Sequence, residues 1–220
     1  MRVFIVNLLV LFFLSAQWVG CNCKIKSKTC PALSSTYKSY ISADIGDTIN
    51  FVNKTGIQTG FLVREKNVWE IAEYRCDNNP YNSCICPDCN VQGGYGAFSN
   101  DTLWTWFDTL NNKAYHYGHL YYTIYESVES GLDRSTLQFN GLEFRFEYPI
   151  TSENLDGNQR IIADTVLGSH SYQNLIVCTI DTSSSWDRYH ESFYTKLFFK
   201  PEFGVVGFHH VKLNDTFYLP

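Results

Sequence analysis

The sequence lacks three features that would assign it to a large class of proteins. It has no run of basic residues: 17 Lys and Arg are scattered among 22 Asp and Glu, and the net charge is −5. Such a chain lacks the clustered positive charge that binds a phosphate backbone, so we expect no nucleic-acid partner. No apolar run reaches the roughly 20 residues that a membrane-spanning helix needs. No capped stretch keeps a 3.6-residue apolar period for more than about three turns, which argues against long helices.

The residues that are abundant favour strands over helices. The 220 residues include 15 Tyr and 16 Phe but one Met, and aromatic residues make up 16% of the chain. Aromatic side chains suit the pleated, half-buried surface of a sheet. The composition therefore predicts an all-β domain.

Short alternating segments follow one another along the chain, separated by turns rich in Gly, Asn and Asp. Roughly ten antiparallel strands in sequential order predict a meander that forms a strongly curved sheet or incomplete barrel, because tight sequential hairpins suit it. A β-sandwich is the alternative. The expected strands are 37–41, 47–52, 59–64, 68–74, 103–110, 119–126, 136–139, 142–148, 160–166, 172–180, 193–200, 203–211 and 217–219.

The clearest local pattern is a hairpin in the middle of the chain. From Leu142 to Tyr148 the apolar residues all fall on one face and the charged residues on the other, as in a strand with one face in water. Residues 136–139 alternate too, and Asn140 and Gly141 supply the two positive φ angles of a type I′ turn. We expect residues 136–139 and 142–148 to pair as a hairpin through this turn.

The first 20 residues have the layout of a secretory signal peptide. Arg2 provides a positive start, and an apolar run from Val3 to Leu14 is followed by the small residues Ser15, Ala16 and Gly20. The run is too short for a comfortable transmembrane helix. We therefore expect an exported protein.

The end of this segment resembles a bacterial lipoprotein signal. Its last residues are Trp18, Val19, Gly20 and Cys21, with Trp18 where a Leu-like residue is usual. In such proteins the cysteine becomes the lipidated first residue, and its acyl chains tether the protein to membrane lipid. The resemblance implies an acylated Cys21; ordinary cleavage and a free secreted protein are the alternative.

Length and composition predict one domain behind a short tether. Residues 21–36 are polar and without an apolar period, and we expect them to form the tether. Residues 37–220 then make a single β-rich domain, long enough for one well-packed core. A cysteine-rich loop at 76–98 interrupts it.

Eight cysteines in an exported chain are more often disulfides than metal ligands. Cys178 lies in an apolar run and is expected as a buried free thiol. Zinc is the rival interpretation, yet only Cys86 and Cys89 have the Cys-x-x-Cys spacing of a zinc knuckle. We therefore expect no metal and no cofactor. The disulfide candidates are Cys23, Cys30, Cys76, Cys84, Cys86 and Cys89.

No catalytic arrangement stands out. No Gly-x-Ser-x-Gly elbow occurs. His116 and His119 would point to opposite faces of a strand, as would His209 and His210, which makes a shared metal site improbable. Glu143 and Glu147 share a face with Arg145 between them, a stripe typical of a wet strand face with cross-strand ion pairs. We predict no catalytic residues and a protein that is not an enzyme.

Two tryptophans and a tyrosine are the candidates for a ligand site. Trp104 and Trp106 share a face if residues 103–110 form a strand, and Tyr121 lies in the next expected strand. Their rings could line a cavity or stack on a sugar, although packing in the core is the commoner role. These three residues form the predicted pocket.

The C-terminal region resembles that of uncharacterised Bacteroidetes lipoproteins. Residues 193–208, Phe-Tyr-Thr-Lys-Leu-Phe-Phe-Lys-Pro-Glu-Phe-Gly-Val-Val-Gly-Phe, are similar to their closing motif, and residues 168–177 to the segment before it. Those families are β-rich envelope proteins without a general assigned activity. The resemblance implies a membrane-anchored location on the periplasmic or cell-surface side of the envelope.

Location and architecture together predict a non-enzymatic β domain. The expected partner is an unknown apolar or amphiphilic ligand, or another envelope protein, bound in an aromatic-lined concavity. A structural assembly module and, with less support, a hydrolase of envelope polymers are the alternatives. A concavity completely filled by side chains would count against the ligand-binding hypothesis.

Overall fold

The structure is a computed structural model and describes the greater part of the chain. The described residues are 27–30, 32–69, 73–75, 77–79, 83–85, 90–108, 111–116, 118–127, 133–180 and 194–220.

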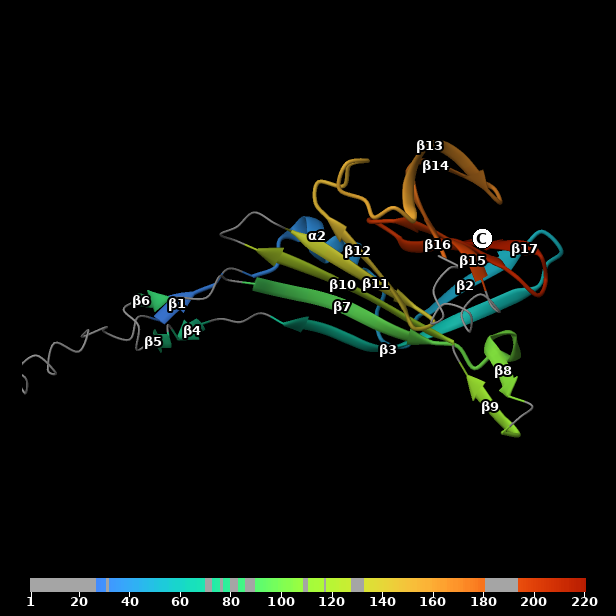
Figure 1. The fold of residues 1–220 in the computed structure, drawn as a ribbon, viewed down its shortest axis with the longest axis horizontal. Coiled ribbons are helices and arrows are strands. Elements are labelled where there is room, and N and C mark those ends of the chain that lie inside the picture. The colour runs from blue at the N-terminus through green and yellow to red at the C-terminus, as the bar shows by residue number, and fades with distance from the viewer. Residues whose placement is uncertain are drawn as a thin grey trace, which may run out of the picture.

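An 11-stranded antiparallel sheet, strongly curled into a half-barrel, forms the body of the protein (Figure 1). The predicted curved sheet or incomplete barrel is confirmed. Neighbouring strands follow the order β12-β11-β10-β7-β3-β2-β17-β16-β15-β14-β13. Their bounds are β2 Thr48–Asn53, β3 Gln58–Trp69, β7 Asn90–Phe98, β10 His119–Ser127, β11 Arg134–Phe139, β12 Leu142–Glu147, β13 Gln159–Leu167, β14 His170–Thr179, β15 Tyr194–Lys200, β16 Gly204–His210 and β17 Asp215–Tyr218.

Two meanders meet in the middle of this sheet. The strands before residue 148 run from β2 outward to β12, and the strands after residue 158 run from the other edge inward to β17. The meanders join where β17 pairs with β2, at Phe217 opposite Asn53 and Tyr218 opposite Val52. The first and last strands of the sheet are therefore neighbours, and the two edge strands are consecutive in sequence.

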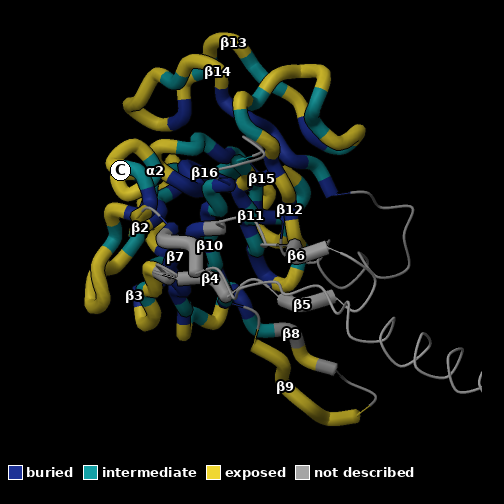
Figure 2. Tube along the Cα trace, turned by 90° about the vertical axis from the view of Figure 1, so that its left-hand side faces the viewer, coloured by how far each residue is buried: buried dark blue, intermediate teal, exposed yellow. Residues whose placement is uncertain are grey.

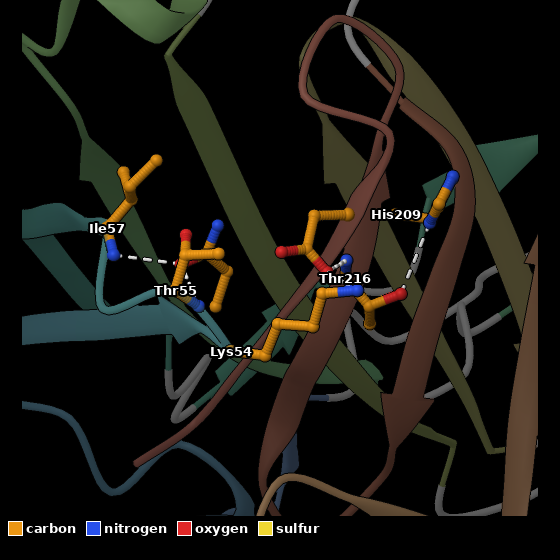
Figure 3. A network of polar contacts seen from close by, with 7 residues as sticks. Lys54, Thr55, Ile57, His209 and Thr216 are labelled. Carbon is orange, nitrogen blue, oxygen red and sulfur yellow. Dashed lines mark hydrogen bonds and ion pairs between the residues drawn. The ribbon is translucent and has the colours of Figure 1, made fainter.

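Polar side chains hold the turns beside this join (Figure 3). The Oδ1 atom of Asn53 accepts hydrogen bonds from the backbone N–H groups of Thr55 and Ile57, at 3.1 and 2.8 Å. Lys54 Nζ lies 3.8 Å from Asp215 Oδ1, which links the β2–β3 turn to the start of β17. Asn53 is thus a buried structural residue that fixes the turn after β2.

The concave side of the sheet is filled by its own aromatic side chains. Along β2, β10, β11 and β12, buried residues alternate with intermediate or exposed ones. Figure 2 colours the tube by this burial. Phe146 stacks on Phe199 with ring centroids 4.5 Å apart, and Phe208 stacks on Phe217 at 5.1 Å. Each fully buried aromatic side chain contributes about 1.5–3 kcal/mol through removal of apolar area from water. Among the described residues, the deep interior of the half-barrel is therefore occupied by packed rings.

A smaller apolar cluster lies on the opposite face, under the β13–β14 hairpin. Leu167, Leu175 and Val206 are its buried members. Asn174 has a φ of 52°, and its two strands lose regular pairing there, so the hairpin bends. Gly168, with a φ of 61°, allows the hairpin tip to approach the ring of Tyr218. The arch seen in Figure 1 is thereby packed against the end of the chain.

The predicted hairpin around Asn140 and Gly141 is confirmed. The φ angles of these residues are 50° and 88°, and β11 pairs with β12 from Phe139 opposite Leu142 to Arg134 opposite Glu147. The Oδ1 atom of Asn140 also accepts a hydrogen bond from the backbone N–H of His119 at 3.0 Å. The turn therefore fixes both the hairpin and the neighbouring strand β10.

Residues 37–41 were expected to form a strand, but residues 37–40 lie in a short helix, α2 Ser35–Tyr40, and Ile41 is its C-cap. Ser34 caps it, because its side chain accepts a hydrogen bond from the N–H of Tyr37 at 3.4 Å. Ser34 also donates its own N–H to Glu126 Oε2 at 2.7 Å. A local cap and a contact to β10 therefore outweigh the weak strand pattern.

The residues flanking α2 belong to the folded domain. Leu33 and Ile41 are each 2% exposed. Both pack over Gly93, where an added Cβ would lie 2.8 Å from Leu33 Cδ2 and 2.7 Å from Ile41 Cδ1. Tyr37 donates to Asp133 Oδ2 at 2.7 Å. The packed domain therefore begins before residue 37, where the sequence placed its boundary with the tether.

The segment expected as a loop at 76–98 ends in a strand of the main sheet. β7 Asn90–Phe98 pairs with both β3 and β10, although Gly93 and Gly94 favoured a loop in the sequence. Four short strands in or before this segment pair outside the main sheet. They are β1 Ser27–Thr29, paired with β4 Glu73–Arg75, and β5 Asp77–Asn79, paired with β6 Ser83–Ile85.

The strand expected at 103–110 is replaced by two shorter elements. A 3-10 turn, η1 Thr102–Trp104, begins at Asp101, whose side chain accepts from the N–H of Leu103. It leads into β8 Thr105–Asp108, which pairs with β9 Lys113–His116 in a hairpin outside the main sheet (Figure 1). No helix in the described part of the chain is long and apolar enough to cross a membrane.

Candidate functional site

A pocket of about 420 Å³ lies where the two edges of the curled sheet separate. We call it the edge pocket. Its volume falls within the range of small-molecule binding sites. Five segments of the chain meet there: α2, the residues after β12, the two strands of the β13–β14 hairpin and the β15–β16 turn. Its lining residues are Tyr40, Tyr148, Pro149, Ile150, Ile161, Asn174, Ile176, Lys200, Pro201 and Glu202.

The sheet edges approach each other at one end and part at the other, which opens the pocket. At the start of β13, the Nε2 atom of Gln159 donates to the backbone oxygen of Arg145 in β12 at 3.5 Å. It also donates to Asp156 Oδ2 at 3.3 Å. Ile161, which follows Gln159 by two residues in β13, and Ile150, which follows β12, line the pocket. The Gln159 side chain therefore links the two sheet edges close in sequence to the residues of the pocket.

The apolar side of the edge pocket is made by aliphatic side chains on the rim of the core. Ile176 is buried, and Ile150 and Ile161 are half-buried and pack against the main core. Apolar surface of this kind gains free energy when a ligand removes it from water, at about 25 cal/mol per Å². This side of the pocket is suited to the apolar part of a ligand.

Tyrosine side chains form a second wall. The ring of Tyr148 lies 5.5 Å from that of Tyr37, which in turn lies 5.8 Å from that of Tyr40. The hydroxyl of Tyr148 donates to Ser135 Oγ at 3.1 Å. Burial raises the pKa of Tyr148, so the phenol stays neutral. The wall therefore offers flat aromatic surface and no negative charge.

The polar end of the pocket carries an ion pair. Lys200 Nζ lies 3.6 Å from Glu202 Oε2, and the two side chains are 20% and 43% exposed. Burial, followed by the nearby Glu202 carboxylate, raises the pKa of Tyr40. The pair leaves this end of the pocket polar with no net charge from these two residues. It is suited to a neutral or zwitterionic group of a ligand.

Of the predicted pocket of Trp104, Trp106 and Tyr121, the structure describes the side chains of Trp104 and Tyr121, which lie on opposite sides of the sheet. Trp104 is fully buried in the core, where its Nε1 donates to Thr59 Oγ1 at 3.0 Å. The backbone of Trp106 pairs with Tyr115 in the β8–β9 hairpin, and its side chain lies outside the described part. Tyr121 is on the convex face of β10. The 3-10 turn at Trp104 breaks the alternation on which the prediction depended.

Cys178 is a buried free thiol, as predicted. Burial, with a smaller effect of Asp156, raises its pKa well above the ordinary value, which makes it a poor nucleophile. Cys30 is 8% exposed, and the backbone of Cys84 lies in β6. The other disulfide candidates, Cys23, Cys76, Cys86 and Cys89, fall outside the described residues, as does the lipidation candidate Cys21.

The adjacent histidines of β16 have different partners on different faces. His209 Nδ1 lies 3.2 Å from Thr216 Oγ1. A dashed line marks this contact in Figure 3. His210 is fully buried: its Nε2 donates to Leu103 O at 3.4 Å, and its Nδ1 accepts from the N–H of Leu213 at 3.3 Å. Burial lowers the pKa of His210. His210 therefore joins the η1 turn to the β16–β17 turn as a neutral ring.

His119 and His116 also make contacts that indicate structural roles. The ring of His119 lies 5.1 Å from that of Phe98 on the convex face. His116 Nε2 contacts the backbone oxygen of Ser99. Among the residues whose side chains are described, no three His, Cys, Asp or Glu lie together as a metal site would require.

The charged stripe of β12 lies on the convex face, in water. Arg145 Nε lies 2.6 Å from Glu143 Oε1, and this ion pair forms along the strand rather than across strands as expected. Glu147 lies opposite Arg134 of β11. All four charged residues are exposed. Arg134, Glu143 and Arg145 line an open pocket of about 290 Å³, of which Glu147 is not a lining residue, so only one of the two acids faces it. The arrangement does not support a pair of catalytic carboxylates.

Searches with the chain found no matching family model, no matching curated protein and no matching solved structure. The case for the edge pocket as a functional site is therefore based on its geometry, since no relative supports it.

Sequence reasoning missed the residues of the edge pocket. Tyr40, Tyr148, Ile161, Ile176 and Lys200 come from separate segments and share no motif. The only available signal was the alternation that places Ile161 and Ile176 on two adjacent strands.

Proposed function

We propose that this protein is an exported, lipid-anchored envelope protein that binds a small amphiphilic ligand in the edge pocket and catalyses no reaction. The observation that carries the proposal is the composition of the pocket: isoleucines on one side, tyrosines on another and a neutralised ion pair at one end. A site with apolar walls and few polar groups is typical of ligand binding.

The ligand class follows from the lining. An apolar or aromatic body would lie against Ile150, Ile161 and Ile176, and a neutral or zwitterionic group would meet Lys200 and Glu202. A ligand with a single negative charge is disfavoured because Lys200 already has a carboxylate partner. The aromatic side chains that fill the concavity count against the binding site expected there, and the proposal is instead based on the edge pocket.

The sequence supports the proposed location of an exported protein anchored to the envelope. The segment from Val3 to Leu14 has the form of a signal peptide, and Cys21 follows the small residue Gly20. The C-terminal resemblance to envelope lipoproteins points to the same compartment. In that compartment disulfides among the remaining candidate cysteines are favoured over zinc.

The proposal is tested by binding of 1-aminoanthracene, a neutral fluorescent amphiphile, to the purified protein. We expect saturable binding that Ile161→Trp weakens by about tenfold or more, because the larger side chain fills the pocket. Val166→Trp is the matched control on the same strand, since Val166 is 65% exposed and does not line the pocket.

Two results would overturn the proposal: no saturable binding by the wild type, or equal binding by wild type and Ile161→Trp. Thermal unfolding of each variant establishes that it is folded before its affinity is interpreted.

A further inference from the structure

The convex face of the sheet contains a strip without side chains, along the glycines of β7. Gly94 lies opposite Asn67 of β3 and Thr123 of β10, and Gly96 lies opposite Glu65 and Tyr121. Outward and inward residues alternate along a strand. The intervening residues Tyr95 and Ala97 are buried, so the glycines belong to the outward set. We call this strip, with its flanking side chains, the glycine trough.

Close packing explains why these positions are glycine. A Cβ on Gly94 would overlap the carbonyl oxygen of Tyr122, and a Cβ on Gly96 would lie 2.8 Å from Cε1 of Tyr121. The tyrosine ring thus lies over the backbone of Gly96, and its centroid lies 5.5 Å from that of Phe98 with the ring planes 89° apart. A ring held on the backbone by one face turns its other face outward. Tyr121 therefore offers a fixed stacking surface.

Polar side chains line the rest of the trough. Its cavity of about 70 Å³ is bounded by Glu65, Asn67, Gln92, Thr123 and Tyr121, with no lysine or arginine among the lining residues. The two amides donate and accept hydrogen bonds, the carboxylate accepts, and the hydroxyl does both. Burial and the nearby Glu65 raise the pKa of Tyr121, which keeps its phenol a donor.

The size and chemistry of the trough select a ligand class. A volume of 70 Å³ corresponds to about two water molecules, so the cavity takes hydroxyl groups rather than a whole ring. The remainder of the ring would lie on Tyr121, whose face attracts C–H groups. Glu65 repels an anionic ligand. Addition of a peptide strand is excluded here because β7 is paired on both sides.

We propose that the glycine trough binds a neutral glycan, with one sugar stacked on Tyr121 and its hydroxyl groups bonded to Glu65, Asn67 and Gln92. This site is separate from the edge pocket, with which it shares no lining residue. A protein with both sites would hold a glycan on its convex face and a small amphiphile at its sheet edge.

The test is a titration of the purified protein with neutral hexasaccharides of glucose, mannose, galactose and xylose, and with a uronic-acid hexasaccharide, followed by calorimetry and saturation-transfer NMR. We expect at least one neutral glycan to bind. Tyr121→Ala and Asn67→Ala should each weaken it by about tenfold, the equivalent of one stacking contact or shared hydrogen bond.

Two controls separate this site from its surroundings and from the edge pocket. Arg64→Ala changes an exposed residue of β3 that does not line the cavity, and Ile161→Trp fills the other pocket; neither should alter glycan affinity. Because Asn67 is exposed, its replacement leaves folding intact even if Tyr121→Ala does not. Failure of all neutral glycans to bind, binding of the uronic-acid chain alone, or unchanged affinity in Asn67→Ala would overturn the proposal.

Discussion

Replacing Gly94 by alanine is the sharpest test of how the sheet is packed. Propensity alone predicts that Gly94→Ala stabilises a strand, by about 0.5–1 kcal/mol, because glycine loses more backbone entropy on folding. The structure predicts the opposite sign. An alanine Cβ would overlap the carbonyl oxygen of Tyr122 and lie 3.0 Å from both Cα and Oγ1 of Thr123. The obstacle is the backbone of β10, which cannot move without disturbing the sheet.

The magnitude follows from the two opposing effects. Overpacking of this kind costs about 1–3 kcal/mol, and the entropy gain offsets about 0.5–1 kcal/mol of it. The net loss in free energy of unfolding is then at most about 2.5 kcal/mol, with a central value of about 1 kcal/mol. For a chain of this size, each kcal/mol shifts Tm by about 2–4 °C, so the central value corresponds to a fall in Tm of about 2–4 °C.

Calorimetry or circular dichroism of the wild type and two variants measures this. Gly157→Ala is the matched control, since a Cβ there meets nothing within 4 Å and no left-handed φ is required. Its Tm should stay the same or rise slightly. A Tm for Gly94→Ala at or above that of the wild type would refute the argument that β7 and β10 are too close for a side chain.

Two further predictions concern pH and the anchor. Burial lowers the pKa of His210. The stability that the neutral ring contributes is therefore fully present above the unfolded-state pKa of about 6.5 and is lost as the pH falls through the folded-state pKa. His210→Gln should flatten the fall in Tm between pH 7 and pH 5, and an unchanged slope would contradict this. Intact mass of the protein extracted from its own membranes should show an acylated Cys21, whereas an unmodified chain beginning elsewhere would remove the anchor from the proposed function.

The parts of the fold that the sequence predicted are those with a strong local pattern. Asn140 and Gly141 carry the positive φ angles of their turn within two residues, and the charged and apolar faces of β12 alternate without interruption. Each is a property of a few neighbouring residues, so sequence suffices to predict it.

The parts that the sequence did not predict depend on partners far along the chain. Gly93 and Gly94 resemble a loop until Ile41 and Tyr122 are known to pack against them. Trp104 fitted an alternating strand, yet the cap at Asp101 starts a 3-10 turn instead and places the indole in the core. The edge pocket needs five segments to meet, and none of them carries a motif for it.

The join between β2 and β17 has a consequence for how the chain is made. Because β17 is the last strand of the sheet to be synthesised, β2 has no neighbour on one side until the C-terminal residues are available. An unpaired strand edge is a template for association between chains. Closing this pair also brings together opposite ends of the sequence, the slowest kind of contact to form. β2 therefore lies at the centre of the finished sheet but is an unpaired edge strand, open to association with other chains, until β17 has been made.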